Sequence, residues 1–393
     1  MKQCFEKMKK NSRNNNFKNG SRKNIKQIIR SAVKKHSSPL LLISRCTIKK
    51  QYDTFRRYLP EVTPYYAVKA NTYPDIIKYL YKLGAFFDVA SANEMALTLS
   101  LGIPPKKLIF AHTIKSEKDL IQASNSGVHL MTYDNEMELY KIKKHCPEAR
   151  LLLRIRVSNL GSNIELSLKF GADVDQAIPL LQKARHFGLN PVGISFHVGS
   201  QCTHSDSYLQ ALEISSTIFQ ESKNYGFDLK ILDLGGGFPI KHRDSDNFED
   251  FKTMARKIRL EIKNLFDKKT QVIAEPGRFM VGPAGTLITQ VVGRTYRNNK
   301  NYYYLNDGIY GDFSGIVFDN CKYEFKTLRN GRKHLSTLAG PTCDSFDTIS
   351  VSEDLPELDL GSVVYVRNIG AYSCASAVTS FNGFTPAKII MVS

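Results

Sequence analysis

Strand-like and helix-like segments alternate along the chain from about residue 64 to residue 280. Eight short strand-like runs follow in order: YYAVKA (65–70), FFDVAS (86–91), LIFAH (108–112), LMTY (130–133), LLLRIRV (151–157), GISFHVG (193–199), ILDLGGG (231–237) and VIAEPG (272–277). Stretches between them, such as PDIIKYLYKLG (74–84) and NEMELYKIKKH (135–145), repeat apolar residues every three or four positions, as amphipathic helices do. This alternation implies a parallel sheet of the α/β class, and eight units fit a (β/α)8 TIM-like barrel. A doubly wound sheet is the alternative.

The pattern changes after about residue 280, where strand-like runs follow one another without long helices. These runs are TLITQVVG (286–293), NYYYLND (301–307), GIVFD (315–319), SVVYVRN (362–368) and KIIMVS (388–393). They predict a separate all-β domain. We therefore divide the chain into a basic leader over residues 1–37 that we expect to be mobile, a barrel domain over 38–280 and a C-terminal β domain over 281–393. Residues 38–48 are expected to pair with the β domain.

Positive charge is concentrated at the start of the chain. The 393 residues carry a net charge of +18, and residues 1–36 hold twelve Lys and Arg against the single acid Glu6. The chain has neither the apolar run of a secretory signal nor one long enough to span a membrane. Its seven cysteines are scattered and never in CxxC spacing, which argues against a zinc site or a disulfide framework. We therefore predict a cytoplasmic protein without a metal, and a mitochondrial presequence is the alternative reading of the leader.

Polar side chains gather at the C-terminal ends of the strand-like runs, where the active sites of barrels lie. They are Lys69, Asp88, His112, Arg154, His197, Ser200, Gly235, Gly236, Gly237, Glu275 and Arg278. Lys69, in PYYAVKAN, follows a run that should be buried. It is either an edge lysine whose stem packs while its ammonium reaches water, or a lysine that forms a Schiff base with a carbonyl compound. The motif GxGxxG is not formed, which disfavours a dinucleotide site.

Taken together, these side chains meet the needs of one cofactor, pyridoxal 5′-phosphate. Lys69 can bond to the aldehyde of this cofactor. Glu275 can keep the pyridine nitrogen protonated, so that the ring accepts electrons. The amides of residues 235–237, together with Ser200 and Arg278, can hold the phosphate.

At these motifs the sequence resembles the pyridoxal-phosphate-dependent group IV decarboxylases, the family that includes ornithine decarboxylase. The resemblance covers about residues 38–393 and rests on the ordered motifs PYYAVKAN, FDVASANE, LLLRIR, SFHVGSQC, LDLGGGFP, AEPGRF, YLNDGIYGDF, GPTCDSFD and GAYSCASAVTSFNGF. It implies an alanine-racemase-like fold (fold type III), in which a barrel is followed by an all-β domain. It also implies pyridoxal phosphate as the cofactor and decarboxylation of an amino acid as the reaction.

The resemblance assigns roles to individual residues. Lys69 would bind the cofactor covalently, with Asp88 and Glu94 positioning it, and Arg154 would support Glu275. The catalytic residues that it implies are Lys69, Cys343, Glu275 and His197, the last lying flat on the cofactor ring. The cofactor-binding residues that it implies are Lys69, Asp88, Arg154, His197, Ser200, Gly235, Gly236, Gly237, Glu275, Pro276, Gly277, Arg278 and Tyr372. The substrate-binding residues that it implies are Phe318, Asp319, Asp344 and Phe381.

The motif GPTCDSFD implies an active site shared between the subunits of a homodimer. By the resemblance, Cys343 returns a proton to the decarboxylated carbon and Asp344 meets the distal amine of the substrate, both from the partner subunit. Asp319 supplies a second carboxylate for the same ammonium. These residues imply L-ornithine as the substrate, with putrescine and CO2 as products. Animal relatives often carry Tyr at the position of Phe318 and His at that of Asn320, so the substrate preference depends on whether that hydroxyl matters.

Other functions fit the sequence less well. Lysine or arginine are the alternative substrates within the family, whereas enzymes for diaminopimelate or carboxynorspermidine usually show CES rather than CDS at the cysteine. A racemase is disfavoured, because Cys343 stands where racemases place a Tyr base. The intact Lys69 and Cys343 argue against a non-catalytic decoy. The confinement of positive charge to the leader argues against a nucleic-acid-binding protein, and we predict neither nucleic acid nor a membrane as a partner.

Overall fold

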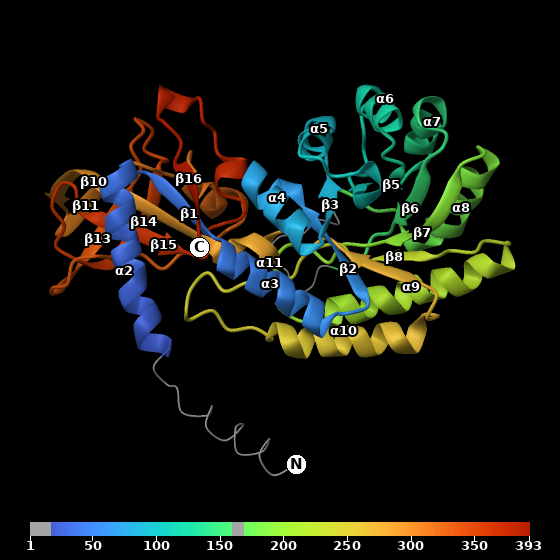
Figure 1. The fold of residues 1–393 in the computed structure, drawn as a ribbon, viewed down its shortest axis with the longest axis horizontal. Helices are drawn as coiled ribbons and strands as arrows, with labels where there is room; N and C mark the ends of the chain where they lie inside the picture. The colour runs from blue at the N-terminus through green and yellow to red at the C-terminus, as the bar shows by residue number, and fades with distance from the viewer. Residues whose placement is uncertain (1–16, 159–168) are drawn as a thin grey trace, which may run out of the picture.

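The computed structural model describes residues 17–158 and 169–393, with side chains from residue 25 onward. Two units lie side by side, an α/β barrel and a unit built around a β-sheet (Figure 1). Residues 1–16, the start of the leader that we expected to be mobile, lie outside the described residues.

Eight parallel strands form a closed barrel, because the last strand pairs with the first. The strands are β2 (Val62–Ala67), β3 (Phe86–Val89), β4 (Leu108–Phe110), β5 (Leu130–Tyr133), β6 (Arg150–Arg154), β7 (Asn190–Ser195), β8 (Ile231–Asp233) and β9 (Gln271–Ala274). Each of the eight strand-like runs of the sequence overlaps one of these strands. The predicted barrel is therefore confirmed, and the doubly wound alternative is wrong.

Helices follow the strands and surround the barrel (Figure 1). The long ones are α3 (Arg45–Tyr58), α4 (Pro74–Leu83), α5 (Ala92–Ser100), α6 (Glu117–Ser126), α7 (Glu136–His145), α8 (Ala177–His186), α9 (Asp206–Asn224) and α10 (Phe251–Leu265), and the short α11 (Arg278–Val281) follows β9. Local sequence sets their ends. Helix α4 stops at Gly84, whose φ of +99° suits glycine alone, and α6 begins with a capping box between Ser116 and Asp119.

Side chains that face the barrel axis form a small apolar layer below the mouth. This interior cluster consists of Tyr65, Ile109, Ala111, Leu152, Val192, Ile231 and Ile273, with Phe86 and Leu130 packed against it. Because strand side chains alternate with a period of two, the next inward position on each strand lies closer to the C-terminal mouth. Those positions are where the polar residues of the site occur.

The second unit is a sheet of eight strands that ends the chain. They are β1 (Leu40–Ser44), β10 (Gly285–Arg297), β11 (Lys300–Leu305), β12 (Lys326–Thr327), β13 (Lys333–Ala339), β14 (Thr348–Pro356), β15 (Val363–Arg367) and β16 (Lys388–Val392). Strand β1 comes before the barrel in the sequence, yet it pairs antiparallel with β10 and parallel with β16. The chain therefore enters the sheet, builds the barrel, and returns to the sheet.

Two segments differ from the sequence prediction. The run GIVFD, expected to be a strand, forms the short helix α12 (Gly315–Phe318), because three apolar residues cannot distinguish a strand from a helical turn. Residues 17–36 of the expected mobile leader form helix α2 (Phe17–His36), which crosses the sheet unit (Figure 1). Its residue Ile29 is fully buried against Leu40 and Ile288 of the sheet, so this half of the leader is anchored by one apolar face.

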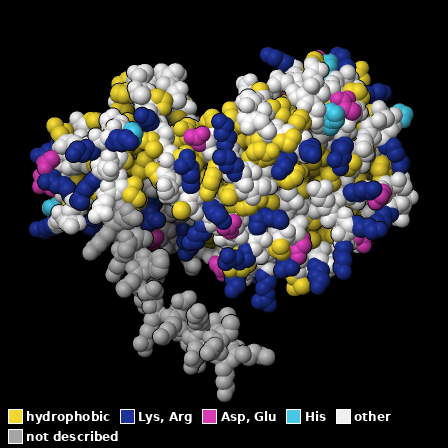
Figure 2. Space-filling model, in the orientation of Figure 1, with side chains coloured by type: hydrophobic (Ala, Val, Ile, Leu, Met, Phe, Trp, Pro, Cys, Tyr) yellow, Lys and Arg dark blue, Asp and Glu magenta, His cyan; other side chains and the backbone are white. Residues whose placement is uncertain are grey.

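Lysine and arginine side chains are spread over the visible face of both units (Figure 2). Hydrophobic side chains lie among them on the same face. Among the described helices, none is both long and apolar enough to cross a membrane.

Candidate active site

Lys69 lies two residues after β2, in the 3-10 turn Val68–Ala70 (η1) rather than in the strand itself. Its ammonium forms an ion pair of 2.5 Å with Oδ2 of the buried Asp88 on β3. The pairing of Ala67 with Asp88 across β2 and β3 brings the two side chains together. Burial is the largest single influence and lowers the pKa of Lys69, but the acidic groups around it, Asp88 first among them, together outweigh burial, so the pKa is raised. The lysine is charged, and 41% of its side chain remains exposed.

Lys69 opens into a cavity of about 290 Å³ at the C-terminal mouth of the barrel. The cavity is lined by Ala67, Lys69, His197, Ser200, Gln201, Gly236, Gly237, Phe238, Glu275, Gly277, Arg278, Phe318, Asp319 and Tyr372. Most of the residues that the resemblance implied for the cofactor are brought together here. Asp88, Arg154, Gly235 and Pro276 are not among the lining residues.

One group of lining residues suits an anion. The guanidinium of the buried Arg278 donates from Nη2 to Oγ of Ser200 at 3.2 Å and lies 4.5 Å from the ring centre of Tyr372. Gly237 has a φ of +99°, and a Cβ on it would lie 2.4 Å from the carbonyl oxygen of Gly199. Only glycine fits there, which leaves the backbone open to the cavity. A fixed cation, hydroxyl groups and exposed backbone amides are the set that holds a phosphate.

His197 follows β7 and forms one wall of the cavity. Its Nδ1 accepts the backbone N–H of Gly199 at 3.0 Å, which fixes the orientation of the ring. A Cβ on Gly236 would lie 3.0 Å from Nε2 of His197, so these two residues are in close contact. Burial lowers the pKa of His197 well below its ordinary value, and the charges of Arg154 and Lys69 lower it further. The imidazole is therefore neutral at neutral pH.

Three ionisable side chains lie at the strand ends near the cavity, and of these Glu275 lines it. On β6, β8 and β9, Arg154, Asp233 and Glu275 each come two positions after a residue of the interior cluster. Oε1 of the buried Glu275 has no hydrogen-bond partner within the described part of the chain. The guanidinium of Arg154 lies 5.4 Å from the ring centre of Phe170 and is attracted by the charges of Glu275 and Asp233. Arg154 thus acts on the two acids through its charge.

The carboxylate side chain that we expect to bind the substrate, Asp319, lies in the same cavity. Asp319 comes directly after α12 and forms an ion pair with Arg278, with 14% of its side chain exposed. Phe318 also lines the cavity, although its side chain is largely exposed. The residue expected to bind substrate therefore contacts the residue expected to bind phosphate.

Cys343, Asp344 and Phe381 form a separate cluster on the sheet unit. The hydroxyl of Tyr310 donates to Asp344 and its ring stacks on Phe381, with 4.4 Å between ring centres. The backbone N–H of Cys343 donates to Oδ1 of Asn382 at 3.1 Å, and Cys343 is exposed. The hydrogen bond from Tyr310 lowers the pKa of Asp344. A single chain thus divides the predicted site into two clusters.

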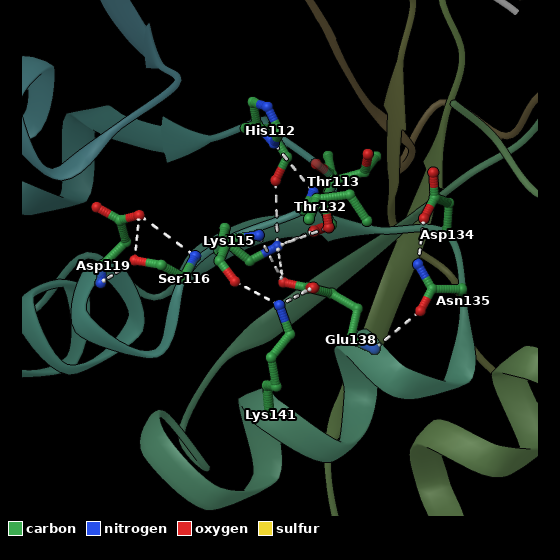
Figure 3. Close-up of polar contacts among 11 residues, drawn as sticks. His112, Thr113, Lys115, Ser116, Asp119, Thr132, Asp134, Asn135, Glu138 and Lys141 are labelled. Atoms are coloured by element: carbon green, nitrogen blue, oxygen red, sulfur yellow. Dashed lines mark hydrogen bonds and ion pairs between the residues drawn. The ribbon is translucent and has the colours of Figure 1, made fainter. Parts of the chain in front are cut away.

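A second lysine at the barrel mouth was not anticipated from the sequence. Lys115, in the loop after β4, is fully buried and forms an ion pair of 2.9 Å with Glu138 of α7. Its ammonium also donates to the carbonyl oxygens of Thr132 at 2.6 Å, His112 at 3.1 Å and Thr113 at 3.2 Å (Figure 3). The loop after β4 is therefore held against β5 and α7 behind the site. His112, one of the strand-end residues of the sequence, belongs to this network and not to the cavity lining.

Sequence reasoning also missed Asp233 and Gln201. Gln201 lines the cavity and holds the loop after β8, because its amide group exchanges hydrogen bonds with the backbone of Ile240 at 2.8 and 3.0 Å. Asp233 stands in the motif LDLGGGFP, at the inward position that the strand period predicts for a polar residue. That period was the available signal for Asp233.

The cavity residues fit pyridoxal phosphate. The amine of Lys69 opens into the cavity, and Glu275 lines the same cavity, so its carboxyl group can meet a ring nitrogen there. Gly237 lines the cavity at a place where any Cβ would clash with the carbonyl oxygen of Gly199. Arg278 and Ser200 supply the cation and the hydroxyl for a phosphate.

Comparisons with known proteins agree with this fit. The family described as "Pyridoxal-dependent decarboxylase, pyridoxal binding domain" matches residues 45–282. The chain is 39% identical to a lysine/ornithine decarboxylase of Selenomonas ruminantium, covering 92% of each chain. It is 37% identical to an ornithine decarboxylase of Schizosaccharomyces pombe, covering 93% of this chain and 87% of that protein. It is also 35% identical to antizyme inhibitor 2 of Xenopus laevis, over 87% of this chain and 78% of the relative.

Solved structures share the whole fold. A lysine/ornithine decarboxylase from Vibrio vulnificus, solved with putrescine, matches with a TM-score of 0.88 and 35% identity, covering 94% of this chain and 98% of that one. An arginine decarboxylase of Paramecium bursaria Chlorella virus matches with a TM-score of 0.88 and 33% identity, covering 93% of this chain and all of that one. The expected alanine-racemase-like fold is confirmed by these neighbours. The chain belongs to the family of pyridoxal-dependent decarboxylases, and pyridoxal phosphate is its cofactor.

Proposed function

We propose that the chain decarboxylates L-ornithine to putrescine and CO2. The observation that carries the proposal is a carboxylate, Asp319, in the same cavity as Lys69 and Glu275. A short acid at this place suits a substrate with a terminal ammonium. The names of the relatives support a basic amino acid, since they include ornithine, lysine/ornithine and arginine decarboxylases.

In this proposal each residue of the cavity has a task. Bound pyridoxal phosphate supplies the electron sink that lets the substrate carboxylate leave as CO2. Lys69 would hold the cofactor covalently and later release the product. Arg278, Ser200 and the glycines would hold the phosphate. The neutral His197 would lie flat against the ring, and Glu275 would meet the ring nitrogen.

We propose further that the working unit is a homodimer with two shared sites. Cys343 and Asp344 do not line the cavity that contains Lys69. They lie on an exposed face of the sheet unit, near the exposed apolar side chains of Phe346 and Phe384. A partner chain that covers this face would bring its Cys343 to the cavity, where the thiol would return a proton to the substrate carbon. The partner's acid would join Asp319 at the distal ammonium.

The substrate is tested by measuring CO2 release from L-ornithine, L-lysine and L-arginine with the cofactor-loaded protein. Ornithine should have the highest kcat/KM, and lysine should be about 10- to 200-fold poorer, because one methylene group is worth that much in discrimination. Asp319→Ala should raise KM for ornithine strongly. Faster turnover of arginine would refute the substrate, and no CO2 from any of the three would favour a non-catalytic relative.

The dimer is tested by mixing two inactive variants. Lys69→Ala and Cys343→Ala chains should each be inactive alone. In a random mixture half of the dimers are heterodimers with one intact site each, so about a quarter of wild-type activity should return. If subunits exchange, as measured with labelled chains, and no activity reappears, the site lies within one chain. We also propose a cytoplasmic location, for which the unpaired cysteines among the described residues are the support.

A further inference from the structure

Asp233 and Glu275 are two buried carboxyl groups on neighbouring strands of the barrel. Asp233 ends β8 and Glu275 follows β9, and the Glu275 N–H donates to the carbonyl oxygen of Gly235 at 2.7 Å. Asp233 is fully buried and Glu275 is 7% exposed. Two carboxylates in contact at such a site repel strongly, so the pair is most stable when it shares one proton.

The donors around Asp233 decide which carboxyl group holds that proton. Ser195 donates from Oγ to Oδ2 of Asp233 at 2.9 Å, and the N–H of Gly235 donates to Oδ1 at 3.0 Å. Such donors favour the charged carboxylate. Asp233 also shares a hydrogen bond with the carboxyl group of Glu275. Because both oxygens of Asp233 already accept, the proton of this bond belongs to Glu275.

The electrostatic surroundings agree with this assignment. Burial raises the pKa of Glu275 well above its ordinary value, the charges of Asp233 and Asp88 raise it further, and Lys69 opposes them in part. Burial also raises the pKa of Asp233, but only to about 6, because its hydrogen bonds favour the charged form. Arg154 is attracted by both acids. At neutral pH the pair therefore carries one proton, on Glu275, and one negative charge, on Asp233.

We propose that Asp233 is a positioning residue that supplies the negative charge for a protonated ring nitrogen of the cofactor, while Glu275, still protonated, supplies the contact. The ring N–H would donate to Oε2 of Glu275, the oxygen that reaches the cavity, because Oε1 is fully buried with no other partner among the described residues. Glu275 would donate from its other oxygen to Asp233. The two acids together then carry one negative charge, which balances the one positive charge of the protonated ring nitrogen. This inference rests on the cofactor and does not depend on which amino acid is the substrate.

Amide substitutions test the pair, because Gln mimics a protonated Glu in shape and hydrogen bonding. In Glu275→Gln the charge stays on Asp233. In Asp233→Asn the pKa of Glu275 falls, so Glu275 becomes the carboxylate and one charge remains. Each single variant should keep the ring nitrogen protonated and lose no more than about 10-fold in decarboxylation rate. The double variant has no charge and should lose at least about 10²-fold, more than the two single effects combined.

The protonation of the ring nitrogen is the readout that a merely structural role would not change. It is measured by nitrogen NMR on ring-labelled cofactor bound to each variant, without any substrate. Ser195→Ala is the matched control, because it removes a donor to Asp233 but leaves both acids, and its ring nitrogen should stay protonated. Loss of the protonated nitrogen in Glu275→Gln alone, or an Asp233→Asn variant as damaged as the double, would overturn the proposal.

A proton count keeps the proposal testable even if Asp233 variants do not fold. Wild type and Glu275→Gln should exchange the same number of protons with the solvent when the cofactor binds, as measured by calorimetry in buffers of different ionisation enthalpy. If wild type releases about one proton more, Glu275 loses its proton on binding and the proposal fails. A failure of the substrate proposal would look different, since CO2 would not form from ornithine while the ring nitrogen signal stayed as expected.

Discussion

Lys69 and Lys115 both lie near the C-terminal mouth of the barrel, and their surroundings are opposite. Among the described residues Lys69 has one hydrogen-bond acceptor, Asp88, and 41% of its side chain is exposed to a cavity. Lys115 has a carboxylate and three carbonyl oxygens around its ammonium and is fully buried. An ammonium has only three N–H donors, so Lys115 is saturated and Lys69 is not. The unsaturated lysine can take part in chemistry, whereas the saturated one holds loops together.

The pKa values of the two lysines are also shifted in opposite directions. Burial lowers the pKa of Lys115, and the charge of Glu138 restores it only in part. Burial also lowers the pKa of Lys69, but the acidic groups around it, with Asp88 first, together raise the pKa above the ordinary value. The direction of a lysine's pKa shift alone therefore does not show whether that lysine is reactive. What distinguishes Lys69 is its open access to the cavity beside Glu275 and Arg278.

The largest expected effect is the loss of chemistry at Lys69. Lys69→Ala removes the amine that we propose bonds to the cofactor, so the visible absorbance of the covalently bound cofactor should disappear. Turnover should fall by on the order of 10⁶-fold, the scale seen when a covalent catalytic group is removed. Absorbance spectra and a CO2 assay measure the two effects. If Lys69→Ala kept both the absorbance and the turnover, Lys69 would not be the reactive lysine that the comparison with Lys115 makes it.

The second expected effect is on stability and belongs to Lys115. Lys115→Met leaves Glu138 buried with Lys141 as its only remaining ion-pair partner among the described residues, at 2.7 Å. Breaking a buried ion pair in this way should cost about 3 kcal/mol of the free energy of unfolding. Urea unfolding measures this cost, and the folded variant should still bind the cofactor covalently. In Lys115→Met/Glu138→Leu the unpaired charge is gone, so part of the lost stability should return.

The third expected effect tests whether a residue beside Lys69, Glu275, contributes to the rate of decarboxylation. Glu275→Ala removes the oxygen that we assign to the ring nitrogen, without touching the Lys115 network. Decarboxylation should slow by about 10²-fold, the scale of a lost electrostatic stabiliser, and the cofactor should remain bound. Single-turnover rates isolate this step from product release. An unchanged rate would contradict the role of Glu275.

The fold was predictable because it depends on repeated local patterns. Eight apolar runs with helical stretches between them specify a closed parallel sheet, and the strand period places polar groups at the mouth. Lys69, Glu275 and Arg278 were found because each follows such a run. The same reasoning failed for the run GIVFD, whose three apolar residues formed a helical turn that presents Asp319 to the cavity.

Long-range convergence was not predictable from the sequence. The carbonyl oxygens of Thr113 and Thr132 meet Lys115 only because the loop after β4 packs against the neighbouring strand β5, and nothing near Lys115 in the sequence encodes this. Asp233 stands in a motif that was recognised, but its partner Glu275 depends on the pairing of β8 with β9. The separation of Cys343 from the cavity likewise depends on the packing of the two units.

The smallest expected effect is the response of stability to alkaline pH, in which the two lysines should act in opposite directions. The pKa of Lys115 is lowered by folding, so its charged form costs stability at neutral pH, and this cost is relieved as the pH rises toward the unfolded value of about 10.4. Lys69 has a raised pKa, so its contribution is complete below about pH 10.4 and is lost above it.

Urea unfolding of the cofactor-free chain between about pH 8 and pH 11 measures these slopes against the reference lysine pKa. The stability difference between wild type and Lys115→Met should rise with pH, because only wild type gains from losing that proton. The difference between wild type and Lys69→Met should fall above about pH 10.4. Lys50→Met is the control for general alkaline effects, since Lys50 lies on the exposed surface of α3. If the stability differences for the Lys69 and Lys115 variants changed with pH in the same direction, the two lysines would not lie in opposite electrostatic surroundings.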